Sequence, residues 1–417
     1  MKRFVALGLR QTCFSSALAG SKTLSPVTFN NTGQIQKQNK SLFAMVTRSF
    51  NDNREQAAQE QYKLACSYTY GDGVPRNYKK AAELYQLASD NGHSQAQYNL
   101  GILYSGAYEG VPQNYKKAAE FYRLAADQGQ AQSQCNLACL FIDGKGVSKD
   151  IKRAIELFQL SADQGYFIAQ YNLGNCYAKG IGFVSQDYKK AAELYQLSAD
   201  QGYAEAQCAL GLLYYKGRGF TQNYDKAAEF YKLAADQGYS EAQCNLGSCY
   251  ENGYGVLQNV SKAVELYQLA VDQGFPQAFS NLANCYDTGK GVARDIDKAL
   301  ELYHLGAHKD NADAQHNLGV CYATGDGVPK DSKKAVKFYQ LAVAQGHPHA
   351  HCNLGMCYRN GDGVPPDDKK AVELFHFAVD KGLALAQINL GICYYLGKGV
   401  SQDYNKAAEL FQLAADQ

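Results

Sequence analysis

The chain has 417 residues, with 41 Lys and Arg against 40 Asp and Glu, so its formal net charge is +1. Hydrophobic residues make up 46% and charged residues 19%, which excludes a disordered or low-complexity chain. The balanced charge excludes a dedicated nucleic-acid binder, because phosphate-backbone recognition needs a strongly basic face. Apolar runs such as residues 4–9 are far shorter than the roughly 20 residues of a membrane span, so no span is expected.

Residues 1–56 differ in composition from the rest of the chain. Seven basic residues precede the first acidic one, Asp52, and Ser, Thr, Asn and Gln are frequent. This composition predicts a basic, disordered N-terminal arm. Residues 1–44 resemble a mitochondrial transit peptide, while Lys2-Arg3 followed by an apolar run is the pattern of a secretory signal. A plain disordered tail, or translation starting at Met45, are the other interpretations. Without targeting, a reducing compartment such as the cytosol is favoured.

The remainder of the chain is an internal repeat. Asn-Leu-Gly at residues 99–101 recurs throughout, and degenerate copies fill the gaps. Measured on its leucine, here called the anchor leucine, the period is 36 residues and twice 37, with the extra residue in the turns 105–110 and 180–184. Ten units therefore run without a linker from about Ala57 to Gln417.

Each unit is predicted to form two helices, A and B. In the fifth unit, apolar residues at 206, 210, 213 and 214 predict helix A, and those at 227, 230, 231 and 234 predict helix B. Gly217 and Gly219 predict the turn between them, and Asn223 an N-cap; Asn or Asp holds this cap position in all ten units. Gly or Ala always follows the anchor leucine, which permits a close helix crossing. A lone unit cannot bury both faces, so the units must stack into an all-α solenoid.

The pattern at residues 312–335, Ala-x-Ala-Gln-x-Asn-Leu-Gly-x-x-Tyr-x-x-Gly-x-Gly-Val-x-x-Asp-x-x-Lys-Ala, resembles the Sel1-like repeat, a longer relative of the tetratricopeptide hairpin. The resemblance covers residues 57–417. It implies a right-handed α-solenoid superhelix that acts as a scaffold or adaptor for protein complexes, and it implies no particular partner. A cysteine-rich branch of the family, for which penicillin binding or β-lactam hydrolysis has been proposed, staples each repeat with a disulfide. Here the staple positions hold residues such as Ala235 and Gln243.

Cysteines recur at two helix A positions, three residues after and two residues before the anchor leucine. Successive copies lie a repeat apart, about 8–10 Å or more, which is too far for a disulfide. Thirteen cysteines in a chain of this length therefore predict buried, reduced thiols rather than a disulfide framework or a metal ladder.

Histidine forms two local clusters. His304 and His308 have the i, i+4 spacing of a shared metal, and His347, His349 and His351 with Cys352 crowd the turn between units eight and nine. No other unit repeats either cluster, so accidental surface histidines are favoured over a zinc site. No metal, cofactor or catalytic residue is predicted, because no phosphate-binding loop, nucleophile elbow or Ser-x-x-Lys motif stands out.

Two further repeated features have structural and functional interpretations. The Asn before the anchor leucine could clamp a peptide, but a half-buried side chain bonded to an inter-repeat loop is favoured. Lys-Lys pairs such as Lys333-Lys334 begin helix B, and nearby acidic residues make a solvated face likelier than a nucleic-acid patch.

One side of helix A varies between units while the scaffold positions stay nearly constant. It comprises the residues two before, two after and five after the anchor leucine, and in solenoids of this type helix A lines the concave side, which usually binds. Its mixed polar and apolar groups predict a groove for a protein or an extended peptide; drift on a solvated surface is the equal alternative. The candidate partner-binding residues are Leu212, Tyr215, Glu251, Asn284, Asp287, His316, Met356, Arg359, Ile392 and Tyr395.

The tenth unit is an ordinary one, with an apolar stripe in residues 410–414 and no further helix to cover it. Solenoid ends normally carry a polar capping unit. We expect end-to-end or partner association there; fraying of the last helix or a truncated chain would also account for the pattern.

Overall fold

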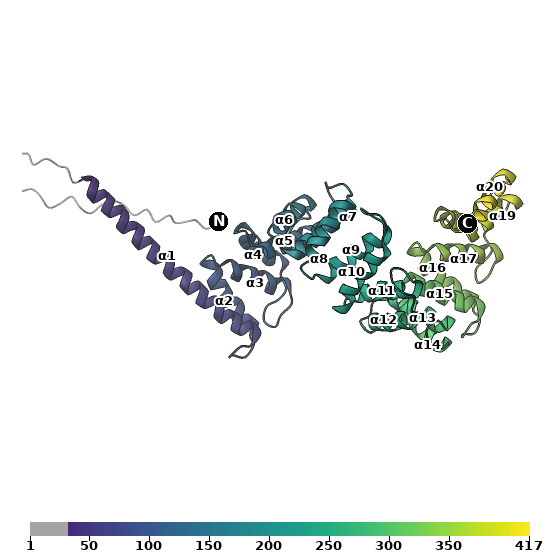
Figure 1. Ribbon diagram of the computed structural model, residues 1–417, viewed down its shortest axis with the longest axis horizontal. Helices are drawn as coiled ribbons and strands as arrows, with labels where there is room; N and C mark the ends of the chain where they lie inside the picture. The colour runs from purple at the N-terminus through teal and green to yellow at the C-terminus, as the bar shows by residue number, and fades with distance from the viewer. Residues whose placement is uncertain (1–31) are drawn as a thin grey trace, which may run out of the picture. The chain divides into compact units, whose positions relative to one another are not determined.

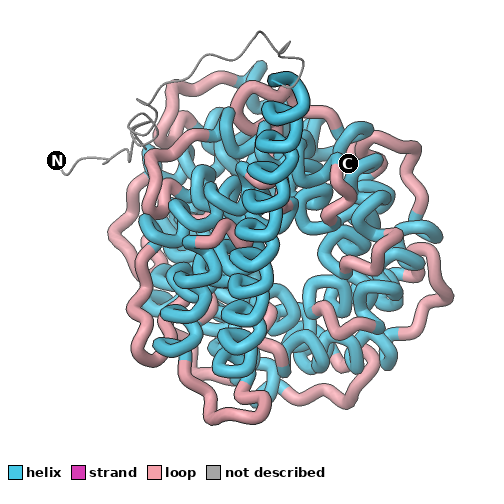
Figure 2. Tube along the Cα trace, turned by 90° about the vertical axis from the view of Figure 1, so that its left-hand side faces the viewer, coloured by secondary structure: helices cyan, strands magenta, loops and turns pink. Residues whose placement is uncertain are grey.

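The computed structural model describes residues 32–417, which form twenty α-helices and no strand (Figures 1 and 2). Two helices make each repeat, so the prediction of an all-α solenoid of ten two-helix units is confirmed. The A helices are α1 (Thr32–Tyr70), α3 (Ser94–Ser105), α5 (Ala131–Asp143), α7 (Phe167–Lys179), α9 (Ala204–Lys216), α11 (Ser240–Asn252), α13 (Pro276–Thr288), α15 (Ala312–Thr324), α17 (Pro348–Asn360) and α19 (Ala384–Leu396). The B helices are α2 (Tyr78–Asp90), α4 (Tyr115–Asp127), α6 (Ile151–Asp163), α8 (Tyr188–Ala199), α10 (Tyr224–Asp236), α12 (Val260–Asp272), α14 (Ile296–His308), α16 (Ser332–Ala344), α18 (Asp368–Asp380) and α20 (Tyr404–Ala415). The described part of the chain divides into two compact units, one that ends at residue 96 and one of residues 97–417.

The first helix differs from the sequence expectation. Residues 32–56, expected to belong to a disordered arm, form the first part of the 39-residue helix α1. No Pro or Gly occurs from residue 34 to residue 70, so nothing in this stretch interrupts a helix. Among the side chains that the structure describes, Ala58 is the first buried one, close to the expected start of the repeats. Of the targeting segment proposed for residues 1–44, residues 1–31 lie outside the described part of the chain and residues 32–44 belong to α1.

The predicted helix ends are confirmed. Asn223 accepts a hydrogen bond from the backbone N–H of Lys226 at 2.9 Å, and an Asn or Asp caps each of the other B helices in the same way. Gly217 ends α9 with φ 62°, which glycine adopts without strain. At Gly219 a Cβ atom would lie 2.8 Å from the backbone carbonyl of Tyr188, so glycine lets this turn touch the preceding repeat.

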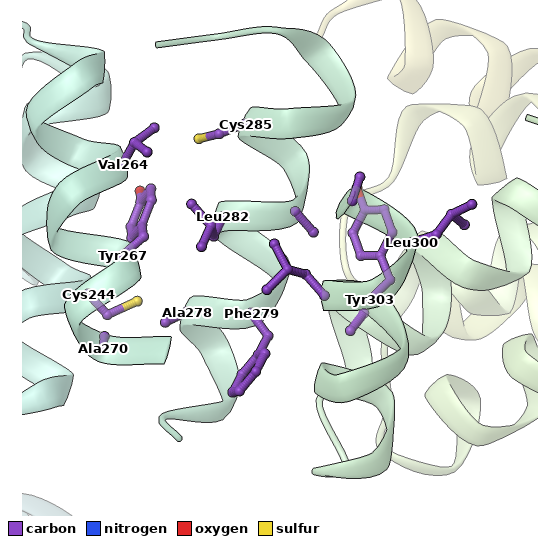
Figure 3. Packing of buried hydrophobic residues seen from close by; sticks show 14 of the residues in the cluster. Cys244, Val264, Tyr267, Ala270, Ala278, Phe279, Leu282, Cys285, Leu300 and Tyr303 are labelled. Carbon is purple, nitrogen blue, oxygen red and sulfur yellow. The ribbon is translucent and has the colours of Figure 1, made fainter. Parts of the chain in front are cut away.

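Each helix A from α5 onward packs between two B helices, that of its own repeat and that of the preceding one. Figure 3 shows this for α13, whose Leu282 points into the core between Tyr267 of α12 and Tyr303 of α14. The anchor leucine is fully buried here, as it is in most repeats. Neighbouring A helices also touch directly, α13 with α15 and α17 with α19. In these repeats the A helices therefore contact one another as well as the B helices on either side.

The small residue after the anchor leucine makes this packing possible. A Cβ atom on Gly211 would lie 2.9 Å from the ring of Tyr231, the buried aromatic residue of the same repeat's helix B. Equivalent contacts exist at Gly174 with Tyr195 and at Gly247 with Tyr267. The predicted role of this position in a close crossing is confirmed.

A buried glutamine ties three helices together in most repeats. Gln207 of α9 donates to the carbonyl of Ala199 at the end of α8 and accepts from Gln237, which follows α10, at 2.8 Å. In two repeats both partners change: Phe279 lies under Lys309, and His351 stacks on Phe377, whose ring faces Lys381. In these two repeats, aromatic rings and a lysine therefore replace the two amides that connect the helices elsewhere, and both residues of the pair differ together.

Candidate binding face on the A helices

The candidate residues lie on equivalent surfaces of successive A helices, from α9 to α19. We call this surface the A face, defined by the residues two before, two after and five after each anchor leucine. The first of these positions is more enclosed than the sequence pattern predicted, because Cys208, Cys244, Ser280 and Cys352 are buried there. All ten candidates are half-buried or exposed, and Tyr395 exposes 54% of its surface. The ten residues thus occupy equivalent positions on successive A helices, as the sequence pattern predicted. Whether they bind a partner stays a prediction.

Several A-face side chains satisfy buried tyrosine hydroxyls of helix B. Glu251 accepts from Tyr267 at 2.6 Å, and Asn284 accepts from Tyr303. In the fourth repeat Asn175 accepts from Tyr195 at 2.7 Å. Sequence reasoning missed this role; the signal was the exchange of Tyr for Phe at the helix B position. Part of the variation on the A face therefore follows the internal hydrogen-bonding needs of each repeat.

The recurring Asn before the anchor leucine links neighbouring A helices. Asn245 donates to the thiol of Cys208 at 3.6 Å and Asn281 to that of Cys244 at 3.4 Å, each reaching back one repeat. Asn353 likewise lies 3.1 Å from His316 Nε2. The expectation of a half-buried structural role is confirmed, but the bonded group is a side chain of the preceding helix A rather than a loop backbone.

Other A-face candidates also have internal partners. Arg359 donates to Asn389 Oδ1 at 2.8 Å, and Asp287 lies 3.7 Å from Arg294. Tyr215 and Tyr395 make edge-on ring contacts with Tyr224 and Tyr404. Leu212, Met356 and Ile392 offer apolar, half-buried side chains between these groups. The A face is thus a mixed surface with tyrosine at both ends of the candidate series.

A pocket of about 300 Å³ lies on the A face between the fourth and sixth repeats. Its lining includes Tyr171 and Lys179 from α7, Cys208 and Ala209 from α9, and Glu241 from α11. Ala209 occupies the position that holds Asn in every other repeat from the second to the tenth. Of the predicted candidates, only Leu212 lines it. The substitution of Ala for Asn was the available sequence signal.

The cysteines have the expected character. All twelve between residues 32 and 417 are free thiols, and nine of them are buried. Burial raises the pKa of Cys249 to about 11, so its thiol stays protonated at neutral pH. Cys66 and Cys357 are half-buried, and Cys139 is exposed and accepts a hydrogen bond from Cys135; this bond holds the pKa of the Cys139 thiol below its usual value.

Two histidines of the turn between units eight and nine, His347 and His349, pack with His316, whose ring stacks on that of His347 at 4.7 Å. His351 is buried, so the expectation of surface histidines is wrong for this residue. His347 accepts from the N–H of Ala350 and lies 3.0 Å from Asp313, while His351 stacks on Phe377 at 3.8 Å. His304 contacts the edges of Tyr322 and Phe338. Within residues 32–417 no group of three His, Cys, Asp or Glu side chains is placed to hold a metal ion.

The second lysine of each Lys-Lys pair lies over a tyrosine ring of helix A. Lys190 lies 4.4 Å from the centre of the Tyr177 ring, and Lys334 lies 5.1 Å from that of Tyr322. These lysines join helix A to helix B inside one repeat. None of the helices described is long and apolar enough to cross a membrane.

Family comparison agrees with this architecture. The Sel1 repeat model matches ten consecutive segments, at residues 61–93, 94–130, 131–166, 168–203, 204–239, 240–275, 276–311, 312–347, 348–383 and 384–417. The chain belongs to the Sel1 repeat family. Repeats of this family are typically non-catalytic scaffolds for protein interactions.

This Sel1 repeat chain is similar to bacterial proteins of known structure. The crystal structure of a protective antigen of uropathogenic Escherichia coli with an SLR fold is 33% identical, covers 89% of this chain and 79% of its own, and has a TM-score of 0.64. A Sel1 repeat protein from Oxalobacter formigenes is 28% identical, covers 59% of this chain and 96% of its own, and has a TM-score of 0.51. A search of curated proteins finds no match.

Proposed function

We propose that this protein is a non-enzymatic scaffold or adaptor that holds an extended polypeptide along the A face. The observation that carries the proposal is the composition of that face. It presents tyrosine, aliphatic and charged side chains in one register on successive A helices, and Tyr215 and Tyr395 are open to solvent at least in part. Regularly spaced aromatic and aliphatic side chains suit the alternating side chains of an extended chain.

The test starts from partners captured by the wild-type chain in its native cell and identified by mass spectrometry. The variant Y215E/Y395E places charge on the A face at two positions whose rings make edge-on contacts with other tyrosines; Tyr215 also packs against the core of the fifth and sixth repeats. We expect it to reduce partner capture at least about tenfold, because buried aromatic anchors dominate such interfaces.

The matched control is L233E/L269E, which places the same charges on exposed leucines of α10 and α12. Circular dichroism must show equal helicity in both variants. Capture that survives Y215E/Y395E but fails in L233E/L269E would assign binding to the B helices instead.

The rival function is hydrolysis of β-lactams by analogy with the cysteine-rich branch of the family. The twelve described cysteines are free, which removes the disulfide feature that defines that branch. A nitrocefin assay on the purified chain should show no turnover above buffer. Sustained hydrolysis, abolished by a single substitution, would overturn the scaffold proposal.

We also propose that the last repeat takes part in self-association. Phe411 of α20 exposes 37% of its surface, whereas the equivalent Phe375 and Tyr339 expose 0% and 3%. An apolar surface of this kind favours a partner molecule. Hydrogen exchange in residues 400–417 should slow as protein concentration rises; fast exchange at every concentration would indicate fraying.

A further inference from the structure

The pocket between α7, α9 and α11 exists because one repeat departs from the Asn pattern. In the neighbouring repeats, Asn172 and Asn245 extend across the gap between A helices and donate to cysteines of the preceding repeat. Ala209 ends at its methyl group and cannot span the gap between α9 and α7. The space that an amide would occupy therefore stays open, and Ala209 lines it.

One end of this pocket combines carboxylates with tyrosine rings. Glu205 and Glu241 hold equivalent positions in the first turns of α9 and α11, and Tyr171, Tyr195 and Tyr239 stand beside them. Burial raises the pKa of Tyr171, and the carboxylates of Glu241 and Glu205 raise it further. Carboxylates of the fifth and sixth repeats therefore place negative charge near the ring of Tyr171 in the fourth repeat.

No cation offsets this charge inside the chain. Within residues 32–417 neither Glu205 nor Glu241 forms an ion pair, and both are only half-buried. Glu241 accepts a neutral hydrogen bond from Tyr239 at 3.1 Å. Carboxylates next to aromatic faces favour a guanidinium or an ammonium group through charge-assisted hydrogen bonds and cation–π contacts.

The opposite end of the pocket carries the opposite charge. Lys179 ends α7, and Arg218 follows α9; both are exposed and form no ion pair within the described residues. Glu205 and Glu241 lie five residues before the anchor leucines of their helices, and Lys179 lies six residues after that of α7. This offset of eleven residues corresponds to about 16 Å along a helix A. An extended peptide covers this distance in about five residues.

We propose that this pocket binds an extended peptide segment that carries a Lys or Arg side chain at the Glu205/Glu241 end and an Asp or Glu side chain about five residues away. The volume of about 300 Å³ is at the low end for ligand pockets and suits one or two side chains of a longer bound chain. The inference rests on the proposed function, since it names the chemistry of the polypeptide that the A face would hold.

The experiment is a selection of twelve-residue phage-displayed peptides on the full-length chain, followed by fluorescence anisotropy with the most enriched peptide. We expect enriched sequences to share a basic residue with an acidic one four to six positions away. E205Q/E241Q should weaken that peptide by about tenfold or more, because it removes both charge-assisted contacts.

Two further variants separate the pocket from general charge effects. Ala209→Asn restores the side chain found in the other repeats, so it should fold normally, fill the gap and also weaken the peptide about tenfold. E193Q/E229Q removes two exposed carboxylates from α8 and α10 and should leave affinity unchanged.

Enriched peptides without a basic residue, no enrichment on the wild-type chain, or wild-type affinity in both A209N and E205Q/E241Q would each overturn the inference. If Y215E/Y395E still abolishes capture of the native partner in that case, the scaffold proposal stands alone. If native partner capture survives every A-face variant, the scaffold proposal itself fails.

Discussion

Individual side chains on the A face serve two purposes that a repeat comparison cannot separate. Tyr267 is fully buried, and its hydroxyl finds its acceptor in Glu251. In repeats where helix B carries Phe158 or Phe375 instead, no hydroxyl needs an acceptor. Variation at these positions therefore reports the identity of a buried aromatic residue as well as contacts with a partner.

Glu251→Leu should destabilise the sixth repeat by about 1–3 kcal/mol, because it leaves the buried hydroxyl of Tyr267 without an acceptor. The double variant E251L/Y267F removes both polar groups and should recover most of the loss. Native-state hydrogen exchange in α11 and α12 measures the local free energy, which a repeat array does not report through one global transition. Equal losses in the single and double variants would contradict this account.

Cys139 should be the most reactive of the twelve described thiols. It is exposed, and the hydrogen bond from Cys135 lowers its pKa, so more thiolate is present at pH 7 than at the buried cysteines. With Cys13 replaced by Ser to remove the thiol outside the described region, N-ethylmaleimide should modify Cys139 first, about tenfold faster than Cys249. Cys139→Ser should eliminate the fast phase, and Cys249→Ser should not.

At the scale of helices, sequence patterns predicted number, order and ends. The Asn or Asp caps and the Gly stops depend on local chemistry, so one repeat is enough to reveal them, and comparison of the ten units reveals the period of 36 residues. The part of α1 before residue 57 was not expected, because its basic and polar composition was interpreted as a disordered arm, although Leu42, Val46 and Phe50 have the i, i+4, i+8 spacing of a helical face. The hydrogen bond between Gln207 and Gln237 and the pocket beside Ala209 were not predicted, because they involve residues of different helices that come into contact only in the packed array.

The turn after α14 contains the one non-glycine residue with positive φ among the residues described. Asp310 has φ 57°, where other repeats carry glycines such as Gly238 and Gly346. Because L residues are strained in this conformation, Asp310→Gly should stabilise the chain by up to about 1 kcal/mol. Gly238→Asp is the reverse change at a site with open space around a new Cβ, and it should destabilise by a similar amount. Native-state hydrogen exchange in α14 and α15 for Asp310→Gly, and in α10 and α11 for Gly238→Asp, checks both signs; faster exchange in Asp310→Gly would refute the strain argument.

At the scale of the whole molecule, stability is distributed along a line of repeats, because each one contacts mainly its neighbours. A local change in conditions can then weaken one part of the array and leave another intact. The histidines are concentrated in one part of the array: six of the eight lie between residues 304 and 351, and none lies between residues 94 and 303.

Acid should weaken the segment from α14 to α17 selectively. Burial, with the nearby His347 second, lowers the pKa of His316 to about 4, and burial also lowers the pKa values of His304 and His351. A histidine whose folded pKa is depressed stabilises the fold fully above its unfolded pKa of about 6.5, and that contribution is lost as the pH falls toward the folded value. Between pH 7 and pH 5 the unfolded segment therefore takes up more protons than the folded one.

Hydrogen exchange at pH 7 and pH 5, corrected for the intrinsic pH dependence of exchange, should show reduced protection in residues 296–360 and little change in residues 131–272, which contain no histidine. His316→Asn should remove part of the difference, because it deletes the most strongly shifted group while keeping a hydrogen-bonding side chain near Asn353. If both segments lose protection equally, the buried histidines do not set the acid response, and a general electrostatic cause acts along the entire array.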